Sequence, residues 1–303
     1  MILCLGLTPA LQRTLIFDSL QLDEVNRASR VIISAAGKPV NTARALAVLG
    51  VECKLAGFNG GLRGAQVIQY LEGYGVESAL TLMHAETRIC STLIDQGSGS
   101  VTELIEEAPQ PSYEEIECFI NDNIELVKSC QLLLICGTLP PFAPVDFYCN
   151  FTRAAAENDV PVIIDSHKEG LLSVLSDHPL MAKMNLQELE RTFECCIESE
   201  TQLIELMTRL IAAGAQSVLI TQGRKPSFLL EGEHLSKFIP PEIDQCISPI
   251  GSGDCTTAGI AASLANGGSW QDAVKLGMAC GSANVEQLLP SDISRERVMQ
   301  LMS

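Results

Sequence analysis

The stretch whose residues could do chemistry most directly is Gly251-Ser-Gly-Asp254, in the last fifth of the chain. Glycine reaches backbone angles that other residues avoid, so Gly251 and Gly253 allow neighbouring N–H groups to converge on one point. A helix beginning near Asp254 adds free N–H groups and the positive end of its dipole, which together make an anion site. An aspartate beside a bound phosphate makes sense as a base that takes the proton from an attacking hydroxyl. The alternative is a capping aspartate after a glycine turn.

Six further polar or glycine-rich motifs stand at the ends of predicted strands. Any one of them could be ordinary turn chemistry. Together they would share one edge of a sheet, and that edge is where open α/β folds build their ligand sites. The motifs are Thr8–Arg13, Gly37–Asn41, Gly137–Pro141, Asp165, Asn185–Glu188 and Thr221–Gly223.

A candidate metal site is Asn185-Leu-Gln-Glu188, where an amide and a carboxylate stand three residues apart on one face of a helical turn. Oxygen ligands of this kind suit Mg²⁺ that is held largely through water beside phosphates. The alternative is a cap at the start of a helix with an acidic first turn. Lys183, two residues earlier, could pair with Glu188 or reach a phosphate.

Gly37-Lys38 superficially suggests a phosphate-binding Walker A loop. It does not fit that motif, because Ile32 stands where the first glycine would be and Pro39 replaces the following Ser or Thr. The first strand also lacks a G-x-G-x-x-G, which argues against a nicotinamide oxidoreductase. The loop could still hold a polar ligand through Lys38 and Asn41, or it could cap a helix.

The composition bounds the kinds of partner that the chain can have. A net charge of −17 argues against nucleic acid and anionic membrane surfaces. It also draws attention to the cations near the motifs, which are Arg13, Arg27, Lys38, Arg88 and Lys183. No apolar run reaches the roughly 20 residues of a membrane span. The first residues show neither a basic leader nor a cleavage site, so we expect a cytoplasmic protein.

The twelve cysteines are scattered and mostly lie in apolar runs, without any C-x-x-C spacing. Disulfide frameworks belong to small secreted domains, so we expect buried and reduced thiols. The four histidines are spread along the chain and give little support to a histidine metal cluster or a Ser-His-Asp triad.

The elements that must position these residues alternate between strand and helix. Strands are predicted near residues 1–7, 53–58, 79–83, 132–136, 160–165, 181–184 and 217–221, and helices near 43–49, 64–74, 113–127, 145–157, 200–213, 258–264, 270–287 and 294–302. Repeated βα units predict a three-layer α/β/α domain with a mostly parallel sheet. Residues 228–230 and 235–238 look like a peripheral hairpin. No repeat or linker interrupts the chain, so we expect one domain over residues 1–303.

Residues 87–107 break this alternation with a β-hairpin pattern around a Gln-Gly-Ser-Gly turn. Residues 14–33 also read as two short β segments. We expect the two regions, at about 12–34 and 86–108, to pair into a small accessory sheet that projects from the main domain as a lid.

Taken together, these motifs resemble the ribokinase-like (PfkB) carbohydrate kinases, and within that family the 1-phosphofructokinase and tagatose-6-phosphate kinase branch. The similarity runs over essentially the whole chain, in the family's order and approximate spacing. The motifs that carry it are Glu24-Val-Asn-Arg27, Gly37-Lys38 with Asn41, Thr87-Arg88, Gly137-Thr-Leu-Pro-Pro141, Asn185-x-x-Glu188 and Gly251-Ser-Gly-Asp254. No single motif is specific, but the combination is.

The resemblance implies a catalytic role for the Gly251–Asp254 stretch. Asp254 would be the general base that takes the proton from the acceptor hydroxyl. The N–H groups of Gly251, Ser252 and Gly253 would stabilise the transferring phosphoryl. ATP would be the phosphoryl donor.

The resemblance also assigns the remaining motifs to binding. Asn185 and Glu188 would organise Mg²⁺ and its waters. Arg27 and Arg88 would reach from the lid toward a phosphate on the sugar, and the lid would also form the contact of a homodimer. The nucleotide side would consist of Lys183, Asn185, Thr221, Gly223 and Asn284, and the sugar side of Gln12, Gly37, Lys38, Asn41, Thr138 and Asp165.

Three departures from the family pattern concern binding. The family's N-P-A-[IL]-D reads Thr8-Pro-Ala-Leu-Gln12, so the sugar-binding aspartate is a glutamine, which can donate as well as accept. Gly-Gly-Lys-Gly reads Ala36-Gly-Lys-Pro39, which predicts a stiffer loop. Pro226, beside Lys225, stands where the nucleotide loop has a second glycine. The catalytic stretch is intact, while the identity of the sugar stays open.

We therefore expect an ATP-dependent sugar-phosphate kinase that acts on a ketohexose phosphate. A phosphorylated acceptor is favoured because Arg27, Lys38 and Arg88 occur in an otherwise acidic chain. One alternative is a kinase of an unphosphorylated sugar or a nucleoside on the same fold. The other is a non-catalytic sugar or nucleotide sensor, which the presence of Asp254 disfavours because a sensor needs no base.

Overall fold

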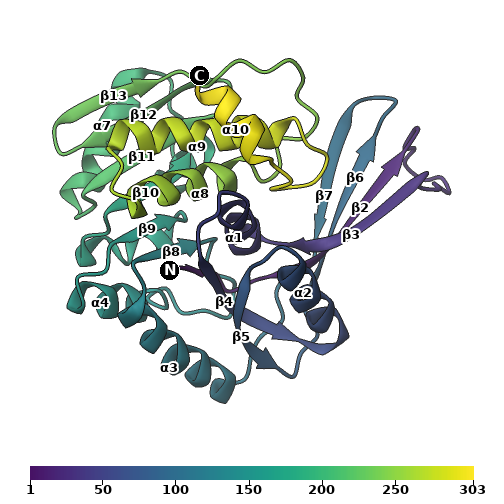
Figure 1. Cartoon of the computed structure of the whole chain (residues 1–303), viewed down its shortest axis with the longest axis horizontal. Helices are drawn as coiled ribbons and strands as arrows, with labels where there is room; N and C mark the ends of the chain where they lie inside the picture. Colours follow the sequence, from purple (N-terminus) through teal and green to yellow (C-terminus); the bar gives the residue numbers. More distant parts are fainter.

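The structure of the chain, a computed structural model, describes all 303 residues. Its centre is a nine-stranded sheet, and a second, four-stranded sheet projects from one side (Figure 1). The strands of the main sheet, in spatial order, are β13 (His234–Phe238), β12 (Lys225–Glu231), β11 (Ser217–Gln222), β10 (Met181–Asn185), β9 (Val162–Asp165), β8 (Leu132–Cys136), β1 (Ile2–Leu5), β4 (Cys53–Gly60) and β5 (Glu77–Met83). The strands from β11 to β5 are parallel, whereas β12 and β13 run antiparallel at one edge.

Helices cover both faces of the main sheet, which confirms the predicted α/β/α layers. One face carries α3 (Tyr113–Ser129), α4 (Cys149–Glu157), α6 (Leu186–Phe193) and α7 (Glu200–Ala212). The other face carries α1 (Lys38–Val48), α2 (Gly61–Gly73), α8 (Ser252–Ala265), α9 (Trp270–Val285) and α10 (Arg295–Met302). The short helix α5 (Glu169–Leu172) and the 3-10 turn η1 (Leu175–Asp177) follow β9.

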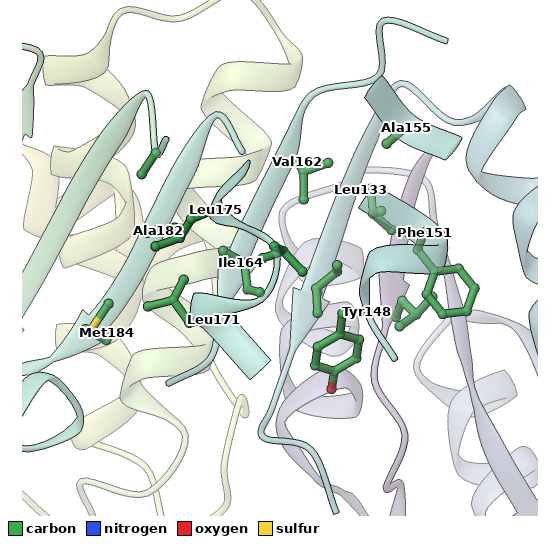
Figure 2. Packing of buried hydrophobic residues seen from close by; sticks show 14 of the residues in the cluster. Leu133, Tyr148, Phe151, Ala155, Val162, Ile164, Leu171, Leu175, Ala182 and Met184 are labelled. Atoms are coloured by element: carbon green, nitrogen blue, oxygen red, sulfur yellow. The ribbon is translucent and has the colours of Figure 1, made fainter. Parts of the chain in front are cut away.

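The central strands separate two hydrophobic cores. In β1, Leu3 and Leu5 point into the core under α3 and α4, whereas Ile2 and Cys4 point into the core under α1 and α8. Side chains alternate between the faces of a strand, so a strand covered on both faces is apolar at every position. Figure 2 shows part of the first core, where side chains of β8, β9 and β10 form a row that reaches Phe151 of α4.

The second sheet, which we call the lid sheet, contains β2 (Ala10–Phe17), β3 (Arg30–Ala36), β6 (Ile89–Asp95) and β7 (Ser100–Ile105) in the order β3-β2-β6-β7. The parallel pairing of β2 with β6 joins two segments that are about 80 residues apart in sequence. In Figure 1 the lid sheet extends away from the main body. The predicted accessory sheet is confirmed.

Two predicted elements differ from the structure. The helix expected from Ala43 begins at Lys38, so the motif Gly37–Asn41 forms its first turn. Pro39 fits there because the first N–H groups of a helix have no partner to lose. The hairpin near residues 228–238 is not peripheral, because β12 and β13 extend the main sheet beyond β11.

All twelve cysteines are free thiols, and eight of them are buried, as the sequence predicts. They contribute to both cores, for example through Cys4 and Cys136 on one face of the sheet and Cys149 on the other. No helix combines the length and the apolar character that crossing a membrane requires.

Candidate active site

The predicted motifs meet at one edge of the main sheet, although by two routes. Five of them lie at the ends of β1, β8, β9, β10 and β11, which are parallel and therefore end together. The other two contain the starts of α1 and α8, reached from the lid sheet and from a loop after β13. The prediction that all seven follow strands of one sheet is wrong for these two. The helix starts nevertheless reach the same edge, because Lys38 contacts Asp165 and Gly253 contacts Lys183.

Asp254 lies in the first turn of α8 and is only 6% exposed. Its Oδ2 accepts a hydrogen bond from Asn41 Nδ2 at 2.7 Å. Burial raises the pKa of Asp254 to about 6 against the opposing charge of Lys38. A carboxylate with this pKa is ionised at neutral pH and is a stronger base than an ordinary aspartate.

Asp165, the last residue of β9, is the centre of a buried network. Its Oδ1 accepts from Lys38 Nζ at 2.9 Å. Its Oδ2 accepts from Lys183 Nζ at 2.7 Å and from Thr257 Oγ1 at 2.6 Å. Burial opposes ionisation, but Lys183 and Lys38 hold the pKa of Asp165 well below its ordinary value. The predicted contact of Asp165 with a sugar does not fit this placement, because both oxygens are engaged and the residue is 1% exposed.

Lys38 joins this network to the start of α6. Its Nζ donates to Asp165 Oδ1 and, at 3.0 Å, to Glu188 Oε1. Burial would lower the pKa of Lys38, but the carboxylates of Asp165, Glu188 and Asp254 raise it well above its ordinary value. Its side chain remains 32% exposed, so this cation is also available to a ligand in the cleft.

Asn185 and Glu188 form a reciprocal cap at the start of α6. Asn185 Oδ1 accepts from the Glu188 N–H, and Glu188 Oε2 accepts from the Asn185 N–H, both at 2.9 Å. The capping interpretation of this motif is therefore confirmed as geometry.

The same donor set limits how these residues could hold Mg²⁺. Both oxygens of Glu188 are engaged, and no group of three or more His, Cys, Asp and Glu side chains could hold a metal ion. Carboxylate and amide oxygens can still accept hydrogen bonds from the waters of a magnesium ion. The residues fit Mg²⁺ held through water beside phosphates, as expected from the sequence, and do not fit a cage of protein ligands.

Gly251 and Gly253, at the start of α8, differ in backbone conformation and in packing. Gly251 caps the helix with φ +83°, and a Cβ there would lie 2.8 Å from Pro290 Cβ. Gly253 has no positive φ, but a Cβ there would lie 3.1 Å from Lys183 Nζ. The prediction from backbone freedom is confirmed for Gly251 and wrong for Gly253, where a side chain would instead be crowded by Lys183.

The N–H groups of this first turn make a candidate anion site, which we call the anion site. The Ser252 N–H donates to the Pro249 carbonyl at 3.3 Å, whereas those of Gly253 and Asp254 donate to no atom of the protein. Free N–H groups at a helix start point away from the helix, and the dipole adds a partial positive charge. Gly253 and Asp254 are therefore better placed than Ser252 to donate to an anion.

A cavity of about 540 Å³ opens beside the start of α8. Its walls come from the end of β11, the loop between β13 and α8, and the facing sides of α8 and α9. Thr221 and Gly223 line it, as do Ser252 and Gly253 of the anion site. A cleft of this size that joins apolar walls to an anion site suits a phosphorylated ligand with a large apolar part.

Three residues predicted for the nucleotide side do not line this cavity. Lys183 lies under the anion site and is 2% exposed, and Asn185 caps α6. Asn284 holds two loops together, because its Nδ2 donates to the Ile250 carbonyl at 2.8 Å and its Oδ1 accepts from the Ser291 N–H at 2.7 Å. Asn284 therefore supports the loop that leads into α8 and does not line the cavity itself.

The remaining residues predicted for the sugar side do not meet at one place: Gln12 and Arg88 lie near the base of the lid sheet, whereas Arg27 lies at its far end (Figure 1). Gln12 is buried in β2, where its Nε2 donates to Thr92 Oγ1 at 2.6 Å. Arg88 donates to the carbonyl and the hydroxyl of Thr8, at 2.9 and 3.1 Å. Arg27 lies exposed in the loop between β2 and β3 without an ion pair, and Thr138 is exposed after β8.

Some residues of the site were missed from the sequence. Arg224 is the only cation that lines the cavity, and it directly follows the predicted Gly223. The loop 239–246 supplies the opposite wall, but it has no regular structure and no periodic pattern that could reveal it. Thr257 could have been found, because it stands one helical turn after Gly253, on the same face.

Comparison with known proteins places the chain in a family. Residues 1–296 match the pfkB family carbohydrate kinases. The chain is 28% identical over 300 residues to the tagatose-6-phosphate kinase of Staphylococcus epidermidis, covering 98% of this chain and 96% of that protein. The fold is shared with phosphofructokinase-2 of Escherichia coli (TM-score 0.90, 22% identity, 99% and 98% of the two chains), which has also been solved as a tetramer. It is shared as well with the ribokinase of Arabidopsis thaliana (TM-score 0.81, 20% identity, 100% and 98%).

The family match confirms the resemblance that the motifs indicated, and the tagatose-6-phosphate kinase relative fits the expected branch. An enzyme of this kind transfers a phosphoryl group to an alcohol. The chain belongs to the pfkB family of carbohydrate kinases.

Proposed function

We propose that the protein is an ATP-dependent sugar-phosphate kinase. It would transfer the γ-phosphate of ATP to a hydroxyl of a ketohexose phosphate, as a 1-phosphofructokinase or a tagatose-6-phosphate kinase does. The observation that carries this proposal is the placement of Asp254, a buried base beside the free N–H groups of α8 and next to the 540 Å³ cavity.

The geometry suggests how each group would act. The acceptor hydroxyl gives its proton to Asp254, whose orientation is fixed by the hydrogen bond from Asn41. The free N–H groups of Gly253 and Asp254 face the transferring phosphoryl, and Lys38 supplies a full positive charge nearby. Mg²⁺, when bound, neutralises phosphate charge, and Asn185 and Glu188 would hold its waters.

A phosphorylated acceptor agrees with the cations on the sugar side. Arg27 is exposed and without an ion pair in the loop at the far end of the lid sheet, and the Lys38 ammonium is partly open to the cleft. In a chain with a net charge of −17, such cations are the groups that can attract a second anionic ligand. The name of the tagatose-6-phosphate kinase relative points the same way.

An ATP-consumption assay over fructose 1-phosphate, fructose 6-phosphate, tagatose 6-phosphate and free hexoses tests the proposal. We expect kcat/KM to be highest for one of the sugar phosphates. Turnover of free hexoses or nucleosides alone would instead establish the alternative, a kinase of an unphosphorylated acceptor.

We also propose that the chain forms a homodimer through the lid sheet, in the cytoplasm. Val31, Ile33 and Leu104 are exposed apolar residues, and the strand register places them on one face of the lid sheet. The reduced thiols fit a reducing compartment. Sedimentation should show a dimer that Ile33→Asp converts to a monomer, and a monomeric wild type would contradict the proposal.

A further inference from the structure

Lys183 makes its contacts behind the anion site, away from the cavity. The residue is 2% exposed and stands in β10. Its Nζ donates to Asp165 Oδ2 at 2.7 Å and to the Gly253 carbonyl at 3.0 Å. An ammonium in this position is a fixed internal group, because a buried charge is held by the partners that compensate its lost hydration.

The contact with Gly253 anchors one peptide group in the first turn of α8. The peptide bond is planar and trans, so the Gly253 carbonyl and the Asp254 N–H point in opposite directions. Lys183 donates to this carbonyl at 3.0 Å, while the single proton of the Thr257 hydroxyl goes to Asp165 at 2.6 Å. The Asp254 N–H is consequently directed to the other side, where no atom of the protein accepts from it.

Gly253 permits this contact because it has no side chain. A Cβ at this position would lie 3.1 Å from Lys183 Nζ, which is closer than carbon and nitrogen normally pack. The backbone at Gly253 is helical and needs no glycine for its angles. The absence of a side chain at Gly253 therefore leaves space for the ammonium.

Asp165, at the end of β9, links Lys183 to α8. It neutralises Lys183 and also accepts from Thr257, one turn further along α8. The start of α8 is thereby tied to β9 and β10 through a single carboxylate and a single ammonium.

Resting on the proposed function, we propose that Lys183, held by Asp165, is a positioning residue for the anion site. It orients the Gly253–Asp254 peptide so that its N–H faces the terminal phosphoryl of the nucleotide. It acts through the backbone of α8 and touches neither nucleotide nor acceptor.

The proposal predicts a defect that depends on the terminal phosphate. The affinities for a non-hydrolysable ATP analogue and for ADP are measured by calorimetry with Mg²⁺ and without an acceptor sugar. Lys183→Met should weaken binding of the ATP analogue about tenfold or more and that of ADP less than twofold, because one well-oriented donor to a charged group is lost. In turnover, kcat should fall while KM for the acceptor stays within about twofold. The matched control is Lys54→Met, which breaks the partly exposed Lys54–Glu77 ion pair and should leave the ratio of affinities unchanged.

Gly253→Ala provides an independent second variant. Its methyl group should displace the ammonium and reproduce the selective loss, even if Lys183→Met fails to fold. In the double variant the methyl has room, so binding should be no weaker than in Lys183→Met alone.

An unchanged ratio of affinities in Lys183→Met would overturn the proposal, as would losses that multiply in the double variant. The proposed function is read separately, from turnover of sugar phosphates by the wild type. An inactive wild type that shows the expected nucleotide pattern would contradict the proposed function and support the positioning role.

Discussion

Turnover by this enzyme should fall about tenfold for each pH unit below about 6, because Asp254 must be ionised to accept a proton. Burial raises the pKa of Asp254 to about 6, and the neighbouring charges act on this pKa in opposite directions. Lys38 and Lys183 favour the ionised carboxylate, while Asp165 disfavours it. The neighbouring thiol of Cys136 stays neutral throughout, because burial raises its pKa to about 12.

Replacing Lys38 by Met should move this fall in turnover at low pH, the acid limb of the pH profile, to higher pH. After burial, Lys38 has the largest influence on the pKa of Asp254, and it lowers it. A close opposite charge typically lowers a carboxylate pKa by about 1–3 units, so its removal should bring Asp254 to about 7 or above. At pH 6.5 the ionised fraction of Asp254 would fall from about three-quarters to about one-quarter or less.

The assay is kcat/KM from pH 5 to 9 for the wild type and for Lys38→Met, with circular dichroism to show that both are folded over this range. Lys38 also belongs to the binding site, so the position of the acid limb is compared rather than the absolute rate. Ionisations of ATP and sugar phosphate are common to both proteins and cancel in the difference. Acid limbs that coincide within about 0.3 units would refute the assignment of this limb to Asp254.

Three further outcomes follow from the same geometry. Asp254→Asn should raise the free energy of unfolding by about 3 kcal/mol at pH 8, because a carboxyl whose pKa is raised in the folded state lowers stability as the pH rises from about 4 to 6. Urea denaturation should show that this gain is largely gone at pH 4. An equal gain in the free energy of unfolding at both pH values would contradict this cause. Gly251→Ala should destabilise the protein by about 1–2 kcal/mol and lower kcat, because alanine meets both the left-handed backbone and Pro290; a thermal shift of zero would show that this loop relaxes freely. Arg27→Ala should raise KM for a sugar phosphate about tenfold, with KM for ATP unchanged as the internal control.

The layers, the lid sheet and the edge that holds the site could all be predicted from the sequence. Strands such as β1 and β8 are apolar at every position because helices cover both faces of the sheet, and this pattern is visible in the chain. The lid segments stood out because alternating β patterns interrupted the βα rhythm. Asp254 could be found because glycines and an acid at a helix start are a local signal.

Partners that meet only in three dimensions could not be predicted. Asp165 was predicted to bind a sugar, but its carboxylate accepts hydrogen bonds from two lysines of distant elements and from Thr257. Gly253 was predicted from its backbone freedom, but the space beside its Cα holds the ammonium of Lys183, which is 70 positions away in the sequence. The apolar wall of the cavity comes from an irregular loop, which has no periodicity to detect.

The central claim is that Asp254 removes the proton from the acceptor hydroxyl, and Asp254→Asn tests it most directly. Asparagine keeps the size of the side chain and can still contact Asn41, but it cannot accept a proton at neutral pH. With the preferred sugar phosphate at saturation, kcat should fall by about 10²–10⁴-fold while the affinity for a non-hydrolysable ATP analogue stays within about threefold. A kcat within tenfold of the wild type, with the nucleotide still bound, would contradict the role of Asp254 as the base.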